Sequence, residues 1–298
     1  MDNARFAVTL LVRDEADIVS ANLEFYLAQN PACMIVTDNG SRDGTVEILR
    51  EYERCGHIEV INEPSLDYRQ GEWVTRMARR AFEKSGAEWV LNVDADEFWV
   101  PKDRGVGLAD ALAKIPEEFD LVRAHRFDLR YLAGSSDRTP WADRLVWRDS
   151  QTGRDDGRLL GPKMAHRGSA SVIVGQGNHS ARGLDAHALF PDEPIEILHL
   201  PLRSWPQFST KIENGGLAYE LNETLAPDVG WHWREDYALL KDERLRGVFD
   251  HRLLTRRAAL RGLVNGRLRR DTWLRRHLMG LTHRAVHGQL LVESLAHR

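Results

Sequence analysis

The stretch AEWVLNVDADEFWV (87–100) decides the fold. It begins as a continuous apolar run, which predicts a strand buried on both faces, and it continues into the acidic cluster at 94–97. Similar buried strands are predicted at FAVTLLV (6–12), CMIVTD (33–38) and HIEVIN (57–62), each followed by a stretch with helical periodicity. This alternation predicts an α/β fold with a mainly parallel sheet and helices on both faces.

The pattern is less regular after Pro101. FDLVRAHRFDLRYL (119–132) predicts a long strand or a bent ribbon, and PIEILHLPLRS (194–204) predicts a strand that ends in a loop. Residues 205–222 and most of 234–298 have helical periodicity. We therefore expect the second half of the chain to add further strands and then a helical part.

The composition is that of a globular protein. Its 298 residues are 42% hydrophobic, which is enough for a sizeable core and excludes disordered and low-complexity classes. The two cysteines, Cys33 and Cys55, support neither a disulfide scaffold nor a zinc finger, so a reducing compartment is expected. The apolar stretch 6–12 is too short to span a membrane and has no cleavage site after it. These features predict a cytoplasmic protein.

The charge is distributed unevenly. Residues 231–298 carry fifteen Lys and Arg and seven Asp and Glu, a net charge of +8, which leaves −12 for residues 1–230. We therefore expect a body at 1–230 and a basic helical extension at 231–298. Such an extension indicates an anionic partner, for which nucleic acid, a lipid headgroup and a phosphorylated substrate are all open. The alternative is a solvated helical bundle whose arginines pair locally.

The acidic cluster gives the strongest chemical signal. Asp94 and Asp96 stand one residue apart where a buried strand ends, and ligands of open α/β sheets bind at that edge. Two carboxylates in this arrangement can hold Mn²⁺ or Mg²⁺, which would bridge the phosphates of a nucleotide. The alternative is an exposed acidic turn. The same spacing in Glu15/Asp17 and Glu51/Glu53 falls in helical stretches and is not expected to bind metal.

A second signal follows the strand at 33–38. Asp38 ends that strand and would face the same edge of the sheet as Asp94, where it could accept a hydrogen bond from a base or a ribose. Gly40 and Gly44 allow the chain to turn tightly, and Asp43 is placed to cap the next helix. The alternative for this segment is a purely structural turn.

Three ordered stretches together resemble glycosyltransferase family 2 and the related bacterial group with a DxDEF signature. They are LLVRDEADIVSANLEFYLAQ, IVTDNGSRDGTVEIL and EWVLNVDADEFWVP, within residues 5–101. A weaker likeness continues through GPKMAHR (161–167), VGQGNH (174–179) and LHLPLRSWPQFSTKIENGG (198–216). The resemblance implies a GT-A fold that binds a nucleotide-sugar, with Mn²⁺ or Mg²⁺ as the cofactor.

The resemblance also implies roles for residues at the strand ends. Asp38 would contact the nucleobase or ribose, Asp94 would face the ribose or the metal, and Asp96 would be the principal metal ligand. The chain departs from the family at Asp14, where the family often has Asn, so a contact made by that Asn is in doubt. Three residues would line the base pocket: Val12, Arg13 and Glu15.

Further candidates lie elsewhere in the chain. A phosphate could be reached by residues before and within the helix predicted at 71–86, although exposed helical side chains are an equal alternative: Arg69, Gln70 and Arg76. A histidine often completes the metal shell of GT-A enzymes, and the two candidates here, each of which could instead be structural, are His179 and His199. A diphosphate clamp is suggested by two cations after the second histidine: Arg203 and Lys211.

The catalytic base cannot be chosen from spacing. An inverting transferase needs a carboxylate or a histidine to take the proton of the acceptor hydroxyl. Several residues of the second half qualify equally: Asp128, Asp155, Asp156, Asp185 and His125.

These observations predict a metal-dependent, inverting transferase that moves a monosaccharide from a nucleotide-sugar, a UDP-sugar in our hypothesis, to a hydroxyl of a glycan or glycolipid. A metal-dependent nucleotidyltransferase or phosphohydrolase would use the same carboxylates, and a nucleotide-sugar-binding protein without turnover is the non-enzymatic alternative. GQGNHS (175–180) matches a dinucleotide fingerprint only weakly, and the signatures of P-loop NTPases, zincins and esterases are absent from the sequence.

The expected partners follow from this hypothesis. They are the nucleotide-sugar donor and a glycan or lipid-linked acceptor, in the synthesis of cell-surface polysaccharide, and nucleic acid is no longer expected. The basic segment 231–298 could dock on the body, on a partner subunit such as a second copy of the chain, or on the inner face of the cell membrane.

Overall fold

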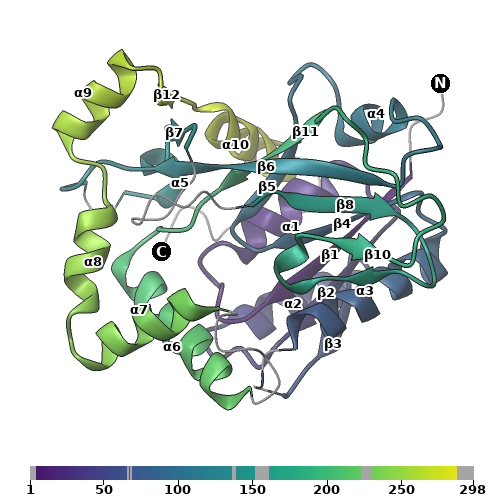
Figure 1. Ribbon diagram of the computed structural model, residues 1–298, viewed down its shortest axis with the longest axis horizontal. Coiled ribbons are helices and arrows are strands. Elements are labelled where there is room, and N and C mark those ends of the chain that lie inside the picture. Colours follow the sequence, from purple (N-terminus) through teal and green to yellow (C-terminus); the bar gives the residue numbers. More distant parts are fainter. Residues whose placement is uncertain are drawn as a thin grey trace.

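A sheet of ten strands forms the centre of the described part of the molecule (Figure 1). The computed structural model describes residues 5–65, 67, 69–135, 139–151, 161–222 and 230–286, and it describes side chains up to residue 281.

The first half of the sheet is parallel, as the alternation of strands and helices predicts. Its strands run in the order β3-β2-β1-β4, and each neighbouring pair is parallel. A helix connects each strand to the next along the chain, because parallel neighbours need a crossover. The elements are β1 (Phe6–Val12), α1 (Val19–Leu27), β2 (Cys33–Asp38), α2 (Thr45–Arg54), β3 (Glu59–Asn62), α3 (Gln70–Ser85) and β4 (Trp89–Asp94).

The second half of the sheet is largely antiparallel. β8 (Lys163–Arg167) pairs antiparallel with β4 and with β6 (Leu121–Arg130), and β7 (Trp147–Asp149) extends the sheet beyond β6. β11 (Ile195–His199) runs parallel to β6 and antiparallel to β5 (Glu97–Pro101). Few helices separate these strands, so the crossovers that parallel pairing requires are missing. The predicted α/β class is confirmed, and the long strand predicted at 119–132 is β6.

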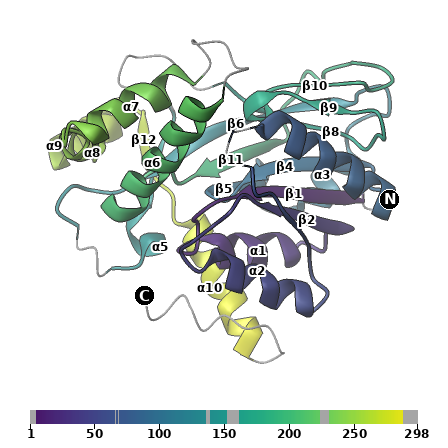
Figure 2. The same cartoon turned by 90° about the horizontal axis from the view of Figure 1, so that it is seen from below.

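Helices cover both faces of the sheet, as predicted (Figure 2). On one face α3 buries Val74, Met77, Ala78 and Ala81, which are spaced at three to four residues and therefore lie on one side of the helix. These residues form a core cluster with Ala7 and others. On the other face lie α1 and α2, and α1 is buried on nearly all sides because α10 (Trp273–Val286) covers it from outside.

Short elements complete the body. Thr45 begins α2 after Gly44, whose φ of 101° favours glycine, and the Asp43 carboxylate accepts a hydrogen bond from the Thr45 N–H at 3.0 Å. The cap residue is therefore Gly44 and not Asp43 as predicted. The remaining elements are α4 (Leu108–Ala113), α5 (Trp141–Arg144), β9 (Ile173–Val174), the 3₁₀ turn η1 (Gln176–Asn178) and β10 (Ala181–Arg182).

The C-terminal part is helical, as predicted, with one exception. α6 (Trp205–Leu221) begins at Ser204, whose hydroxyl accepts a hydrogen bond from the Gln207 N–H, and it packs on the next helix. The later elements are α7 (Trp231–Lys241), α8 (Leu245–Arg252), α9 (Arg256–Val264) and β12 (Leu268–Arg270), before α10. The unpredicted β12 pairs with β7 and so belongs to the central sheet. The division at residue 230 stays a prediction.

None of the helices in the described part combines the length and the apolar composition that crossing a membrane requires.

Candidate active site

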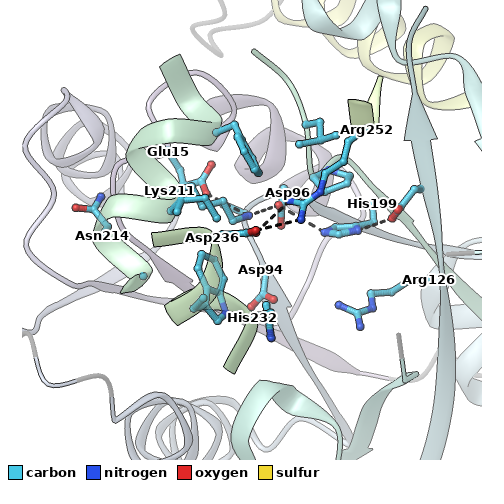
Figure 3. Close-up of a pocket in the computed structure, with 18 of the residues that line it drawn as sticks. Glu15, Asp94, Asp96, Arg126, His199, Lys211, Asn214, His232, Asp236 and Arg252 are labelled. Atoms are coloured by element: carbon cyan, nitrogen blue, oxygen red, sulfur yellow. Dashed lines mark hydrogen bonds and ion pairs between the residues drawn. The ribbon is translucent and has the colours of Figure 1, made fainter. Parts of the chain in front are cut away.

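A cavity of about 780 Å³ opens at the carboxyl ends of β1 and β4 (Figure 3). These strands are parallel neighbours, with Leu11 opposite Asp94, so the residues that follow them meet at one edge of the sheet. The other walls come from α6, α7 and the end of α8. Nine of the residues named from the sequence line the cavity: Val12, Arg13, Glu15, Gln70, Asp94, Asp96, Asp128, His199 and Lys211.

Asp96 is the centre of the charged cluster in this cavity. Its side chain is buried, and its Oδ2 atom lies 2.5 Å from Nζ of Lys211, 3.6 Å from Nε2 of His199 and 4.0 Å from Nη1 of Arg203. Burial alone would raise the pKa of Asp96, but Lys211 and His199 hold it well below its usual range. Asp96 is therefore an ionised carboxylate that cations surround.

His199 lies between two carboxylates. Its Nδ1 is 2.7 Å from Oδ1 of Asp128, because His199 on β11 stands opposite Asp128 in the parallel pairing with β6. This hydrogen bond orients the ring with Nε2 toward Asp96. Burial alone would lower the pKa of His199, but Asp96 and Asp128 raise it to about 9.

Asp94 has a different partner. Its Oδ2 accepts a hydrogen bond at 2.6 Å from Nζ of Lys163, a buried residue on β8. The same ammonium is 3.5 Å from Oε1 of Glu97, which is fully buried. Lys163 thus holds Asp94 at the cavity edge, a contact that the sequence does not reveal because β8 joins β4 only through long-range pairing.

Arg203 lies outside the cavity lining, which corrects the prediction that it clamps a diphosphate there. Its guanidinium is 1% exposed, and it donates hydrogen bonds to Glu15 and to both carboxylate oxygens of Asp17. Burial alone would lower the pKa of Arg203, but Glu15 and Asp17 raise it above its usual value. Arg203 therefore joins the segment after β1 to the segment before α6.

The two arginines predicted to reach a phosphate, Arg69 just before α3 and Arg76 within it, also lie outside the cavity. Arg69 donates to Asp67 at 2.6 Å, and Arg76 donates to Glu63 at 2.9 Å. Both side chains are about half exposed and pair with surface carboxylates, in agreement with the alternative of exposed arginines.

Asp38 ends β2 next to the cavity, whose lining includes the following residue Asn39. Its Oδ2 accepts the backbone N–H groups of Gly40 and Ser41 at 3.1 and 3.2 Å, so it holds the predicted turn. Its other oxygen, Oδ1, is buried and has no hydrogen-bond partner among the described residues.

The remaining sequence candidates are placed elsewhere. His179 does not line the cavity, and its Nδ1 is 2.7 Å from the carbonyl oxygen of Pro162. His125 contacts Glu193 at 2.8 Å, and Asp185 is exposed; neither lines the cavity. Two further base candidates lie outside the described residues: Asp155 and Asp156.

The far wall of the cavity consists of residues that no motif marks. Asp236 on α7 forms an ion pair with Arg252 at 3.1 Å, and Asp149 on β7 forms ion pairs with Arg130 and Arg267 at 2.9 and 2.8 Å. Other members of this wall are His232, Trp233 and His251. β7 is far in the sequence from α7 and α8, so only the folding of the chain brings the residues of this wall together.

A further contact concerns the position where the chain departs from the family pattern. Asp14 has a φ of 54°, and its Oδ2 accepts a hydrogen bond at 2.6 Å from the side-chain amide of Asn214 on α6. Its Oδ1 accepts the backbone N–H of Arg42 at 2.6 Å. Asp14 therefore joins the ends of β1 and β2 to the helical wall.

Asp96 and His199 fit part of a divalent metal shell. Their facing atoms are 3.6 Å apart at the cavity, and a carboxylate oxygen and an imidazole nitrogen are both accepted by Mn²⁺. The described residues contain no group of three or more His, Cys, Asp or Glu side chains that could hold a metal ion. A cation here would therefore need oxygens from a bound phosphate or water to complete its shell, which is usual beside phosphates.

The α/β sheet, with acidic residues after β4 and a cavity at its carboxyl edge, is the arrangement that the resemblance to GT-A enzymes leads us to expect. Residues 10–129 match the model of the family described as "Glycosyl transferase family 2". The resemblance seen in the sequence is thereby confirmed over this segment, and the match supports a glycosyltransferase. No curated protein sequence matches the chain.

The chain has a loose likeness to several solved structures. One is S. aureus TarS 1–349, with 17% identity and a TM-score of 0.40, covering 81% of this chain and 69% of that one. The same protein in complex with UDP has 13% identity and a TM-score of 0.39, covering 97% and 94%. Glucosyl-3-phosphoglycerate synthase from Mycobacterium tuberculosis, in complex with Mn²⁺, UDP and glucosyl-3-phosphoglycerate, has 17% identity and a TM-score of 0.29, covering 41% and 44%.

Proposed function

We propose that this protein transfers a monosaccharide from a nucleotide-sugar, a UDP-sugar in our hypothesis, to a hydroxyl of a glycan or glycolipid, with inversion and with Mn²⁺ or Mg²⁺. The observation that carries the proposal is the convergence of Asp96, His199 and Lys211 at the carboxyl edge of β4. The family match over residues 10–129 supports glycosyl transfer rather than other uses of the same carboxylates.

In this proposal Asp96 and His199 would hold the cation. Asp96 is ionised because Lys211 and His199 lower its pKa, so its oxygen is ready to bind. When bound, the cation would supply positive charge to stabilise the departing nucleoside diphosphate. Lys211, whose ammonium lies in the same cluster, binds a phosphate oxygen beside it. Asp128 keeps the His199 ring in the required orientation through Nδ1.

The nucleotide end of the donor lies along the ends of β1 and β2. Val12 and Arg13 line the cavity there, and Asp38 stands beside it. The unpartnered Oδ1 atom of Asp38 supports a role as acceptor for a base or ribose donor, because a buried carboxylate oxygen without a partner is costly. Asp94, held by Lys163, contacts the ribose in this arrangement.

The acceptor enters from the helical wall formed by α6 to α8. Inversion needs a base on that side of the sugar, and of the described candidates Asp128 lines the cavity. Asp128 is therefore the candidate base as well as the hydrogen-bond partner of His199. Its replacement should lower the turnover rate more than the affinity for the donor.

Product analysis with a panel of nucleotide-sugars tests the reaction. We expect metal-dependent release of a nucleoside diphosphate, lost in Asp96→Ala and in the more conservative Asp96→Asn. A matched control, Asp192→Asn, changes an exposed carboxylate away from the cavity and should keep the activity. Pyrophosphate as the product would assign a nucleotidyltransferase instead, and full activity of both Asp96 variants would refute the site.

A further inference from the structure

One helix exposes the large apolar side chains that a surface helix normally buries. In α9 the buried residues are Ala259 and Gly262, whereas Leu260, Leu263 and Val264 are 66%, 43% and 90% exposed. A helix that packs on a core usually directs its large apolar residues inward. Here the small residues face inward, and Gly262 lets the helix approach Leu268 of β12 so closely that a Cβ would lie 2.5 Å from it.

Arginines accompany this apolar face. Residues 251–270 contain seven arginines and no Asp or Glu. Arg257 and Arg261 are exposed and stand one turn apart, next to Leu260 and Val264, which are also one turn apart. Within the part of the chain that the structure describes, neither arginine has an ion pair of 4.0 Å or less, whereas Arg252 and Arg267 are paired with Asp236 and Asp149.

The position of α9 fits a docking helix. It lies at one end of the molecule in both views, next to α8 and far from the N-terminal end (Figures 1 and 2). The residues on either side of it in the chain, His251 and Leu253 before and Arg267 after, line the cavity. A surface that binds α9 would therefore lie beside the candidate active site.

We propose that α9 docks the protein on an anionic lipid bilayer, with Leu260, Leu263 and Val264 in the interface and the neighbouring arginines at the lipid headgroups. Apolar side chains flanked by arginines on one exposed helix are typical of helices that lie in the plane of a membrane. Positive charge without acidic residues complements the negative surface of such membranes. The proposal uses no property of the donor site. Vesicle binding therefore tests it independently of the proposed function, which product analysis tests.

Cosedimentation of the full chain with vesicles tests the proposal. We expect binding to phosphatidylcholine vesicles that contain phosphatidylglycerol, weaker binding at high salt, and little binding to phosphatidylcholine alone. The double variant Leu260→Gln, Val264→Gln should weaken the binding by at least about tenfold, because it removes the apolar contact. The double variant Arg257→Gln, Arg261→Gln should weaken it as well and reduce its dependence on salt.

Two matched controls separate the site from general effects. Arg50→Gln with Arg54→Gln removes two exposed arginines one turn apart on α2, and Leu221→Gln with Met279→Gln removes two apolar side chains that are 48% and 50% exposed. Both controls should bind vesicles as the wild type does. Thermal midpoints of all variants should stay close to that of the wild type, because every changed side chain is exposed.

Several results would overturn the proposal. The first is that the wild type does not bind anionic vesicles. The second is that both α9 variants bind vesicles as strongly as the wild type does. The third is that the two control variants lose as much vesicle binding as the α9 variants. Self-association that Leu260→Gln, Val264→Gln abolishes, without vesicle binding by the wild type, would assign the face to a second copy of the chain instead.

Discussion

At the scale of single residues, the account depends on how charge is arranged around Asp96. This carboxylate is buried among Lys211, His199 and Arg203, and His199 is in turn held by Asp128. A buried charge is tolerated only where opposite charges and hydrogen bonds compensate it. The cluster therefore keeps Asp96 ionised and keeps Nε2 of His199 directed toward it, which is what a metal ligand pair requires.

The Asp128–His199 hydrogen bond should affect metal affinity. Asp128→Asn removes the charged acceptor of the Nδ1–H group, so we expect Mn²⁺ to bind about 10–100-fold more weakly in the presence of a nucleoside diphosphate. Titration calorimetry measures this. Asp185→Asn is the control, because Asp185 is exposed and does not line the cavity. Unchanged affinity in Asp128→Asn would show that the hydrogen bond does not support the ligand.

Metal binding should also depend on pH. The pKa of His199 is raised to about 9, so at neutral pH the ring carries a proton that a metal must displace. The apparent Mn²⁺ affinity should rise by up to about tenfold for each pH unit between about 7 and 9, and then level off. Calorimetry in several buffers should also detect the released proton. A flat profile over this range would contradict the assignment of His199 as a ligand.

The residues whose position at the cavity could be predicted from the sequence are those that stand at the ends of strands. Asp38, Asp94 and Asp96 stand where predicted buried strands end, and all three lie in or beside the cavity. Arg203 was misplaced because its partners Glu15 and Asp17 come from the other end of the chain. Their charge draws the guanidinium into the interior, and no spacing near Arg203 indicates this.

At the scale of elements, the helical wall depends on close contact between α6 and α7. A Cβ at Gly216 would lie 2.2 Å from Cγ of Tyr237, and one at Gly215 would lie 2.3 Å from Cε3 of Trp233. Two adjacent glycines therefore let α7 lie directly on α6, and this contact positions Asp236 and His232 at the cavity.

Substitution of one of these glycines should separate the two helices. Gly216→Ala should destabilise the protein by about 1–3 kcal/mol, because the ring of Tyr237 must move. Gly247→Ala is the matched control on α8, where the new Cβ meets nothing within 4 Å and the change should be neutral or stabilising by about 0.5–1 kcal/mol. Urea denaturation measures both. Equal stability of the two variants would contradict the close packing.

A buried histidine in the sheet should make the fold sensitive to acid. Burial lowers the pKa of His166 on β8 from 6.5 to about 4. Between these values the unfolded chain binds a proton that the folded chain does not, so stability falls as the pH falls. This shift corresponds to about 3 kcal/mol. Urea denaturation at pH 7 and pH 4.5 should show that His166→Gln loses less unfolding free energy on acidification than the wild type does. An equal loss in the two proteins would contradict the lowered pKa of His166.

Elements were predicted from sequence where their patterns were long and regular. The parallel strands and α3 were predicted because apolar runs and helical spacing are strong there. β12 was not, since its three residues, Leu268 to Arg270, show no alternation and are a strand only because they pair with β7. The antiparallel pairing of β8 with β4 and β6 depends in the same way on contacts far apart in sequence.

At the scale of the whole molecule, the structure places two surfaces near each other. The cavity holds the Asp96 cluster at the edge of the sheet, and the helical part that walls it continues into α9. The basic charge of residues 231–298 is partly used within the protein, since Arg252, Arg267 and Arg275 pair with acidic residues. We propose that the arginines of α9 instead contact the headgroups of an anionic membrane.

The most direct test of the central claim is the thermal midpoint of the protein with UDP, with and without Mn²⁺. Ligands that bind the native state raise the midpoint. The account predicts an increase with UDP that is much larger when Mn²⁺ is present, and loss of this metal-dependent increase in Asp96→Asn and in His199→Gln. The same increase with and without Mn²⁺ in the wild type, or an unchanged metal-dependent increase in both variants, would contradict it.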